Sequence, residues 1–241
     1  MSSFSSKVIE DPSLRNKTRI FKDREHAGQL LADKLESFTT KDTVLLAIPA
    51  GGVPVGFVIA KAFQIPLNLI ILRKIKIPWN PEAGFGSVAP DGTVFLNEPL
   101  VKRLGLTKDE IERSAAETLN EIKRRQQQFG VEFPNVKDKT VVLVDDGLAS
   151  GFTMIAAINF VKKYSSMVIV AVPTAPLGTV QRVAPLVDKL VCLNVRESWV
   201  FAVADAYQKW YDLNDDEVKG YLTKAAKNIS SKIEKKREFT P

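Results

Sequence analysis

Short apolar runs alternate along the chain with longer segments whose apolar residues recur at helical spacing. Uninterrupted runs of four to seven apolar, often β-branched residues are typical of strands buried on both faces of a parallel sheet. Between them, apolar residues recur every three or four positions, as in helices packed on a sheet. The predicted strands are 43–48, 67–72, 141–144, 167–172 and 189–195. We therefore expect an α/β fold with a doubly wound, mostly parallel, five-stranded sheet.

The predicted helices connect these strands and extend beyond the last one. A capping box at Thr107 to Glu110 starts a helix that runs to about residue 129. The only histidine, His26, falls in the first turn of the first helix, which favours a capping or surface role and excludes a histidine-based catalytic triad. Further helices are expected at about 24–38, from after Gly56 to about 63, at 154–161, at about 179–187 and from 215 onward.

The segment 75–97 departs from this alternation. Pro78-Trp79-Asn80-Pro81 interrupts regular structure, and two alternating runs, 85–89 and 93–96, flank the turn Pro90-Asp91-Gly92. Such a pattern predicts a two-stranded ribbon inserted into the fold. A simple hairpin that covers the sheet edge is the alternative.

Length and composition indicate the number of domains and the cellular compartment. The 241 residues, 45% hydrophobic and 26% charged, suit a single domain over 1–241, with a core at about 20–215 and a basic C-terminal helix at about 215–238. The one cysteine, Cys192, lies in an apolar run and is expected to be buried. Residues 1–17 contain no apolar signal segment, and no stretch approaches 18 apolar residues. We expect a soluble, cytoplasmic protein without a membrane partner.

The net charge of +6 is compatible with nucleic acid, an acidic membrane or a polyanionic small substrate. Basic residues gather at 15–24, at Arg73, Lys74 and Lys76, and in the C-terminal helix, which also carries acids. No aromatic residues interleave with the basic ones as a nucleic-acid platform requires, so nucleic acid is not the favoured partner.

The strand at 141–144 leads directly into the strongest candidate site. Asp145 and Asp146 follow the strand, and the small-residue turn at 147–151 opens a helix near Thr153. Backbone N–H groups and the dipole at a helix N-terminus favour a phosphate there. Paired carboxylates suit ribose hydroxyls or magnesium. Together they indicate a phosphorylated sugar, although acids and glycine turns also occur at strand ends for structural reasons alone.

A second strand–turn–helix unit offers another anion site. Pro49-Ala50-Gly51-Gly52 follows the strand at 43–48 and precedes an apolar helix. A tight turn that lets helix and strand pack closely is an equal alternative. Arg73 and Lys74 follow the strand at 67–72, at the edge where α/β sheets bind ligands, and a solvated strand end is their simpler interpretation. The chain contains no P-loop, dinucleotide-binding turn, nucleophile elbow or Cys/His metal set.

The uninterrupted order of hydrophobic strand, Asp145-Asp146, and the loop Ser150-Gly151-Phe152-Thr153 before a helix resembles a known signature. It is similar to the phosphoribosyl-diphosphate (PRPP) binding signature of type I phosphoribosyltransferases, with Ser150 where threonine is usual. The resemblance covers about residues 20–215 and implies the core of that family with a small hood from the termini. It implies transfer of ribose 5-phosphate from PRPP to a nitrogen acceptor such as a nucleobase, with release of pyrophosphate and with Mg²⁺ as cofactor.

The resemblance also implies residue roles. Asp145 and Asp146 would be catalytic and would hold the ribose hydroxyls or Mg²⁺. Trp199, after the last strand, is a candidate for contact with the acceptor base, with packing of the C-terminal segment as its commoner use. The remaining roles are the 5-phosphate loop Ala149, Ser150, Gly151, Phe152 and Thr153; the pyrophosphate site Ala50, Gly51, Gly52, Arg73 and Lys74; and a lid at Glu82, Gly84, Phe85, Gly86 and Ser87.

Two features keep a different class of function open. The loop Pro173-Thr174-Ala175-Pro176 lacks the lysine that 6-oxopurine enzymes of this type usually carry, and the C-terminal helix is basic. A non-catalytic regulator that senses PRPP or a nucleotide and binds a partner or nucleic acid is the alternative. The lid-like segment favours an enzyme. The sequence leaves the acceptor and the formation of a homo-oligomer open.

Overall fold

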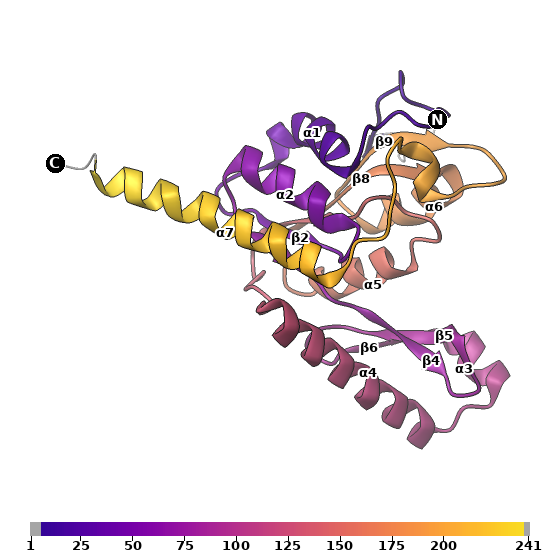
Figure 1. Ribbon diagram of the computed structural model, residues 1–241. Helices are drawn as coiled ribbons and strands as arrows, with labels where there is room; N and C mark the ends of the chain where they lie inside the picture. Colours follow the sequence, from indigo (N-terminus) through magenta and orange to yellow (C-terminus); the bar gives the residue numbers. More distant parts are fainter. Residues whose placement is uncertain (1–5, 239–241) are drawn as a thin grey trace.

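The chain folds around one parallel sheet that carries helices on both faces (Figure 1). The computed structural model describes residues 6–238, with the backbone alone described at positions 81, 82 and 230–238. All strand pairs in this sheet are parallel. Its order is β1–β9–β8–β7–β2–β3, and the bounds are β1 Val8–Ile9, β2 Val44–Ala47, β3 Leu67–Leu69, β7 Thr140–Val144, β8 Met167–Pro176 and β9 Lys189–Arg196.

Alternation along the strands distributes their side chains between two cores. In β7, Val141 and Leu143 pack with α5 (Phe152–Val161) and α6 (Leu177–Val183) on one face. Val142 and Val144 pack with α1 (Arg24–Leu35) and α2 (Gly52–Phe63) on the other. The predicted doubly wound α/β fold is therefore confirmed.

The sheet has six strands, one more than the apolar pattern indicated. The additional strand, β1, pairs Val8 with Leu190 and Ile9 with Val191 of β9. Two residues are too few to produce a recognisable alternation, so the sequence pattern predicts the first strand only at 43–48.

The insertion forms a separate lobe together with α4. Figure 1 shows this lobe set off from the parallel sheet. Instead of two strands, it has three antiparallel strands in the order β4–β5–β6. The elements of the lobe are β4 Arg73–Ile77, β5 Asn80–Val88, β6 Val94–Leu96, α3 Glu98–Leu104 and α4 Lys108–Phe129. Ile75 and Phe85 of the ribbon and Ile122 of α4 are fully buried in a shared core. The capping box predicted at Thr107 and Glu110 is present.

The lobe begins earlier than the sequence suggested. The strand expected at 67–72 ends at Leu69, and Arg73 and Lys74 are the first residues of β4. The alternation Arg73-Lys74-Ile75-Lys76-Ile77 explains this difference, because Ile75 and Ile77 are buried whereas Lys74 and Lys76 are exposed. A half-buried ribbon strand requires that pattern.

The segments near the two ends of the chain meet at the carboxyl end of the sheet. The Asn16 N–H donates to the Val195 carbonyl at 3.1 Å, and the Phe21 N–H donates to the Ala206 carbonyl at 3.0 Å. This pairing places residues 11–22 beside residues 193–208, where the resemblance to phosphoribosyltransferases predicts a hood.

The last helix, α7 (Asp215–Glu238), packs on α2 and α4 at its start and then projects from the body (Figure 1). The rings of Phe57 and Tyr221 lie 5.3 Å apart, and Arg125 Nη2 of α4 lies 2.9 Å from Asp215 Oδ1. Within residues 6–238, no helix combines the length and apolar character that crossing a membrane demands.

Candidate functional site

Asp145 and Asp146, the acid pair, stand at the carboxyl end of β7. Asp145 is half-buried and Asp146 is buried. The Asp146 N–H donates to Asp145 Oδ1 at 2.9 Å, which fixes the first carboxylate next to the second. Burial raises the pKa of Asp145 well above its ordinary value of 3.8, and the negative charge of Asp146 adds to that shift. Burial also raises the pKa of Asp146, although the adjacent Arg24 opposes this shift.

Arg24 is a member of this site that the sequence did not reveal. It is the first residue of α1, after the N-cap Asp23, and only 6% of it is exposed. Its Nε lies 2.8 Å from Asp146 Oδ2, and its Nη1 donates to the Tyr211 carbonyl at 2.9 Å. Its guanidinium carbon lies 3.9 Å from the centre of the Trp210 ring. The sequence showed Arg24 only as one of a basic cluster, because its partner is 122 positions away.

Tyr207 holds the backbone of the acid pair. Its hydroxyl donates to the Asp146 carbonyl at 2.6 Å, and its side chain is buried against Phe21 and Trp210. Burial, together with the negative charge of Asp146, raises the pKa of this phenol well above its ordinary value. Tyr207 therefore stays neutral and able to donate.

The turn Ala50-Gly51-Gly52, the glycine turn, is pressed against the acid pair. A Cβ at Gly51 would overlap the carboxylate of Asp146 and would lie 2.7 Å from its Oδ1. A Cβ at Gly52 would lie 2.6 Å from the Val144 carbonyl oxygen. The Ile48 N–H donates to that same carbonyl at 2.9 Å, and the Pro49–Ala50 peptide bond is cis. The glycine turn and the acid pair therefore meet at the ends of the neighbouring strands β2 and β7, and a side chain at Gly51 would displace the Asp146 carboxylate.

Residues 149–153, which are predicted to bind the 5-phosphate and are called the phosphate loop below, lie at the N-terminus of α5. Gly151 is the N-cap with φ +74°, a conformation that favours glycine. Two contacts tie the loop's carbonyls to α6: the Thr179 hydroxyl donates to the Ala149 carbonyl at 2.7 Å, and Arg182 Nη2 donates to the Ser150 carbonyl at 3.0 Å. Ala149, Ser150, Phe152 and Thr153 are exposed. The start of the helix is thus open to a ligand.

Arg73 and Lys74 do not join this constellation. Arg73 Nε lies 3.8 Å from Glu121 Oε2 of α4. Lys74 lines a cavity of about 390 Å³ between β4 and α4, together with Lys76 and Arg113. The structure therefore places both cations in the lobe.

The residues proposed as a lid form part of β5, the middle strand of the ribbon. Phe85 is fully buried, and a Cβ at Gly86 would lie 2.5 Å from the Phe95 carbonyl oxygen. Gly84 and Ser87 pair with β4 on the same strand, and the side chain of Glu82 lies outside the described residues. A movement of this segment would accordingly be a movement of the ribbon.

Trp199 lies in the loop after β9 and is fully exposed, as is most of Val200. On β8 and β9, near this loop, three polar atoms are buried without a hydrogen-bond partner in the described part of the chain: Thr174 Oγ1, Asn194 Oδ1 and Arg196 Nη1. Thr174 packs against Gly147, the residue after the acid pair, because a Cβ there would lie 3.1 Å from its Cγ2.

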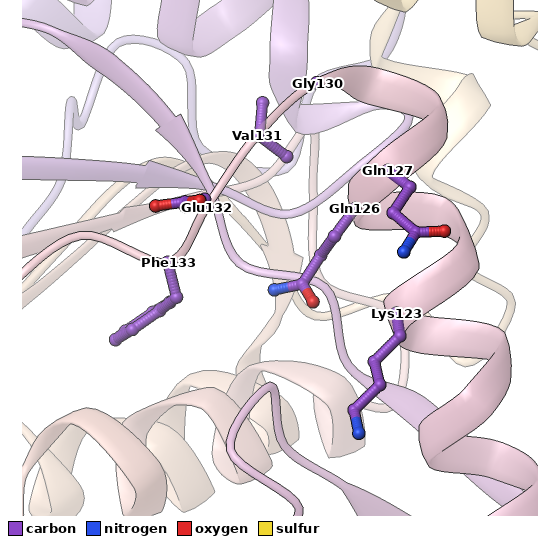
Figure 2. A pocket seen from close by; sticks show the side chains of 7 residues that line it. All are labelled: Lys123, Gln126, Gln127, Gly130, Val131, Glu132 and Phe133. Atoms are coloured by element: carbon purple, nitrogen blue, oxygen red, sulfur yellow. The ribbon is translucent and has the colours of Figure 1, made fainter.

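A larger pocket, of about 570 Å³, lies at the end of α4 (Figure 2). It shares no residue with the acid pair, the glycine turn or the phosphate loop. Figure 2 shows polar side chains from α4 at one side and the segment after the helix at the other. Its lining residues are Lys123, Gln126, Gln127, Gly130, Val131, Glu132 and Phe133.

The protein has an α/β fold, and the acid pair, the glycine turn and residues 149–153 follow the carboxyl ends of β2 and β7 in its parallel sheet. The sequence model of the family described as "Phosphoribosyl transferase domain" matches residues 18–208. The chain therefore belongs to the phosphoribosyl transferase family.

Individual proteins agree with this assignment. Two Mycobacterium tuberculosis proteins, from strains CDC 1551 / Oshkosh and ATCC 25618 / H37Rv, are each named "Putative phosphoribosyl transferase" and are 34% identical over 215 residues. The match covers 88% of this chain and 48% of each relative, so the chain spans about half their length. The crystal structure of TT1426 from Thermus thermophilus is also similar, with a TM-score of 0.73 and 32% identity over 85% of this chain and 98% of that one.

Proposed function

We propose that this protein transfers the ribose 5-phosphate group of PRPP to a nitrogen acceptor and releases pyrophosphate. One observation carries the proposal: the carboxylate of Asp146 lies directly against Gly51. The two turns predicted to bind anions and the two carboxylates follow the ends of the neighbouring parallel strands β2 and β7, an arrangement that suits a sugar with phosphate groups at both ends.

The acid pair would bind the ribose ring. Its carboxylates can accept hydrogen bonds from the two ribose hydroxyls, and their charge would favour the positive charge that develops on the ring at the transition state. The pair also fits Mg²⁺, which binds one or two carboxylates together with substrate phosphates rather than a full protein cage. Among the described residues, no group of three or more His, Cys, Asp or Glu forms such a cage. When bound, Mg²⁺ would supply charge neutralisation at the pyrophosphate.

The two turns would hold the ends of the donor. The phosphate loop, with Ser150 and Thr153 hydroxyls exposed at the start of α5, suits the 5-phosphate. In the glycine turn, the N–H groups of Ala50 and Gly51 suit the pyrophosphate, since the Gly52 N–H donates to the Ile48 carbonyl at 3.0 Å. Arg73 and Lys74 remain a prediction for this end, one that requires the ribbon to bring them toward the sheet.

The reaction is a displacement at C1 of the ribose. The bond between C1 and the pyrophosphate oxygen breaks, the bond between C1 and the acceptor nitrogen forms, and the acceptor loses its proton to solvent. The protein contributes orientation and electrostatics, since binding both ends of the donor leaves C1 positioned for attack. The β4–β6 ribbon would exclude water from this step.

The acceptor would lie between the acid pair and the loop that carries Trp199. An exposed indole offers a stacking surface for a flat nitrogen heterocycle. Thr174, whose buried hydroxyl has no hydrogen-bond partner in the described part of the chain, packs its methyl group against Gly147, the residue after the acid pair. These features support a nucleobase-like acceptor.

The proposal is tested by measuring PRPP-dependent pyrophosphate release with Mg²⁺ against purines, pyrimidines and other nitrogen acceptors. We expect one class of acceptor to stimulate release. Binding of PRPP without stimulation by any acceptor would favour the regulator instead, and salt-dependent binding of RNA or DNA would then identify its partner. Absence of both PRPP binding and release would contradict the proposal.

A further inference from the structure

The Arg24–Asp146 ion pair lies next to the glycine turn, and the charge of Asp146 affects whether this turn can bind an anion. One carboxylate oxygen, Asp146 Oδ2, lies against both the glycine turn and Arg24. It would overlap a Cβ at Gly51, and it is 2.8 Å from Arg24 Nε. An anion on the N–H groups of this turn would therefore sit within a few ångströms of a carboxylate. Like charges at such distances repel strongly where water is scarce.

Arg24 is built to remain beside that carboxylate. Its Nη1 donates to the Tyr211 carbonyl, and its guanidinium stacks on Trp210. The side chain of Asp146 is 12% exposed and that of Arg24 is 7% exposed, so the pair is shielded from solvent. Since the pair is buried, salt does little to screen either charge.

We propose that Arg24 is a positioning residue for the glycine turn: it fixes and neutralises the Asp146 carboxylate, so that the turn can accept the pyrophosphate end of the donor. This inference rests on the proposed function and deepens it. Ala50, in the turn itself, carries no charge, and Arg73 lies beside Glu121 in the lobe. Arg24 lies 2.8 Å from the carboxylate that abuts the turn, and it is the cation that the contacts of the described residues place there.

The test measures binding of inorganic pyrophosphate calorimetrically in metal-free buffer, so that any magnesium role of the acid pair does not enter. We expect Arg24→Met to weaken binding by at least about tenfold, because it leaves the carboxylate uncompensated beside the turn. Arg24→Lys should stay within a few-fold of the wild-type protein. The double variant Arg24→Met/Asp146→Ala should regain affinity, because the repelling group is gone.

The recovery of pyrophosphate affinity in the double variant distinguishes this role of Arg24 from a role in packing alone. If Arg24 served only to fill space under Trp210, the double variant would bind no better than Arg24→Met, and the inference would be wrong. Arg24→Gln, which keeps a planar polar group without the charge, replaces Arg24→Met if that variant does not fold. Arg15→Met is the matched control, since Arg15 pairs with Glu10 and Glu197 at a partly exposed site.

The outcomes also distinguish the inference from the function on which it rests. Equal pyrophosphate affinity in Arg24→Met and the wild-type protein would overturn the role of Arg24 and leave the proposed function standing. Failure of the wild-type protein to bind either pyrophosphate or PRPP would overturn both.

Discussion

The hydroxyl of Tyr207 donates a 2.6 Å hydrogen bond to the backbone carbonyl of Asp146, across 61 positions of sequence. The contact joins the C-terminal segment to the end of β7. It fixes the backbone from which both carboxylates project, so the segment after β9 contributes to the geometry of the site as well as to the core.

Replacement of Tyr207 by phenylalanine tests this contact. The variant leaves a buried carbonyl without its donor, and we expect the free energy of unfolding to fall by about 1 to 2 kcal/mol. Urea denaturation measures the change. Tyr164→Phe, at a residue that is 43% exposed, serves as control and should stay within about 0.5 kcal/mol of the wild-type protein. Equal effects of the two changes would argue against a role for the Tyr207 hydroxyl.

Gly51→Ala tests the contact between the glycine turn and the acid pair. Gly51 has an ordinary helical φ of −60°, so the added methyl group acts only through its overlap with Asp146. We expect PRPP affinity to fall about a hundredfold, as for a catalytic group displaced by an ångström. Gly220→Ala in α7, where a Cβ would meet nothing within 4 Å, should leave affinity unchanged and add up to about 1 kcal/mol of stability. Unchanged affinity in Gly51→Ala would show that the turn does not bind the donor.

Asp145 should produce an unusual dependence of stability on pH. Its pKa in the folded protein lies well above the ordinary value of 3.8, because of burial and the charge of Asp146, with Arg24 as the opposing charge. Above pH 3.8 the unfolded chain therefore loses this proton before the folded protein does. Its contribution to stability is complete below that pH and is lost as the pH rises through the raised pKa.

Urea denaturation between pH 4 and pH 8 measures this contribution by difference. We expect the ligand-free wild-type protein to lose stability with rising pH relative to Asp145→Asn, which cannot release the proton. Asp33→Asn, at an exposed position of α1, should follow the wild-type curve. Parallel curves for the wild-type protein and Asp145→Asn would contradict the raised pKa.

Much of the fold follows from local sequence patterns. Where the observed elements differ from the predicted ones, the cause is also local. Uninterrupted runs such as Val141 to Val144 indicate buried strands because both of their faces meet helices. The helix α3 was not predicted, although Asn97 caps it and Gly105 ends it with φ +67°. Seven residues are too short to show a helical period, whereas the long α4 shows one clearly.

The site was predictable where its residues are neighbours in sequence. Asp145, Asp146 and the phosphate loop follow one strand, so their proximity is local. The contact of Gly51 with Asp146 could be expected only from parallel pairing of β2 with β7, which brings two strand ends together. Arg24, Tyr207 and Trp210 depend on tertiary packing, and no spacing in the sequence marks them.

Trp199→Ala tests where the acceptor binds. Because the side chain is fully exposed, stability should change by no more than about 0.5 kcal/mol. Loss of a stacking contact worth about 1.4 kcal/mol should raise the KM for the acceptor about tenfold. Steady-state kinetics with both substrates measures this, and the KM for PRPP should not move. An unchanged KM for the acceptor would place the acceptor elsewhere.

The central claim is that the acid pair forms the donor site, and a calorimetric titration with PRPP and Mg²⁺ tests it most directly. We predict saturable binding to the wild-type protein and to Asp33→Asn. For Asp145→Asn/Asp146→Asn we predict an affinity at least about a hundredfold lower, with an unchanged circular dichroism spectrum, because two charged contacts are lost together. Affinity of the double variant within a few-fold of the wild-type protein would contradict the account.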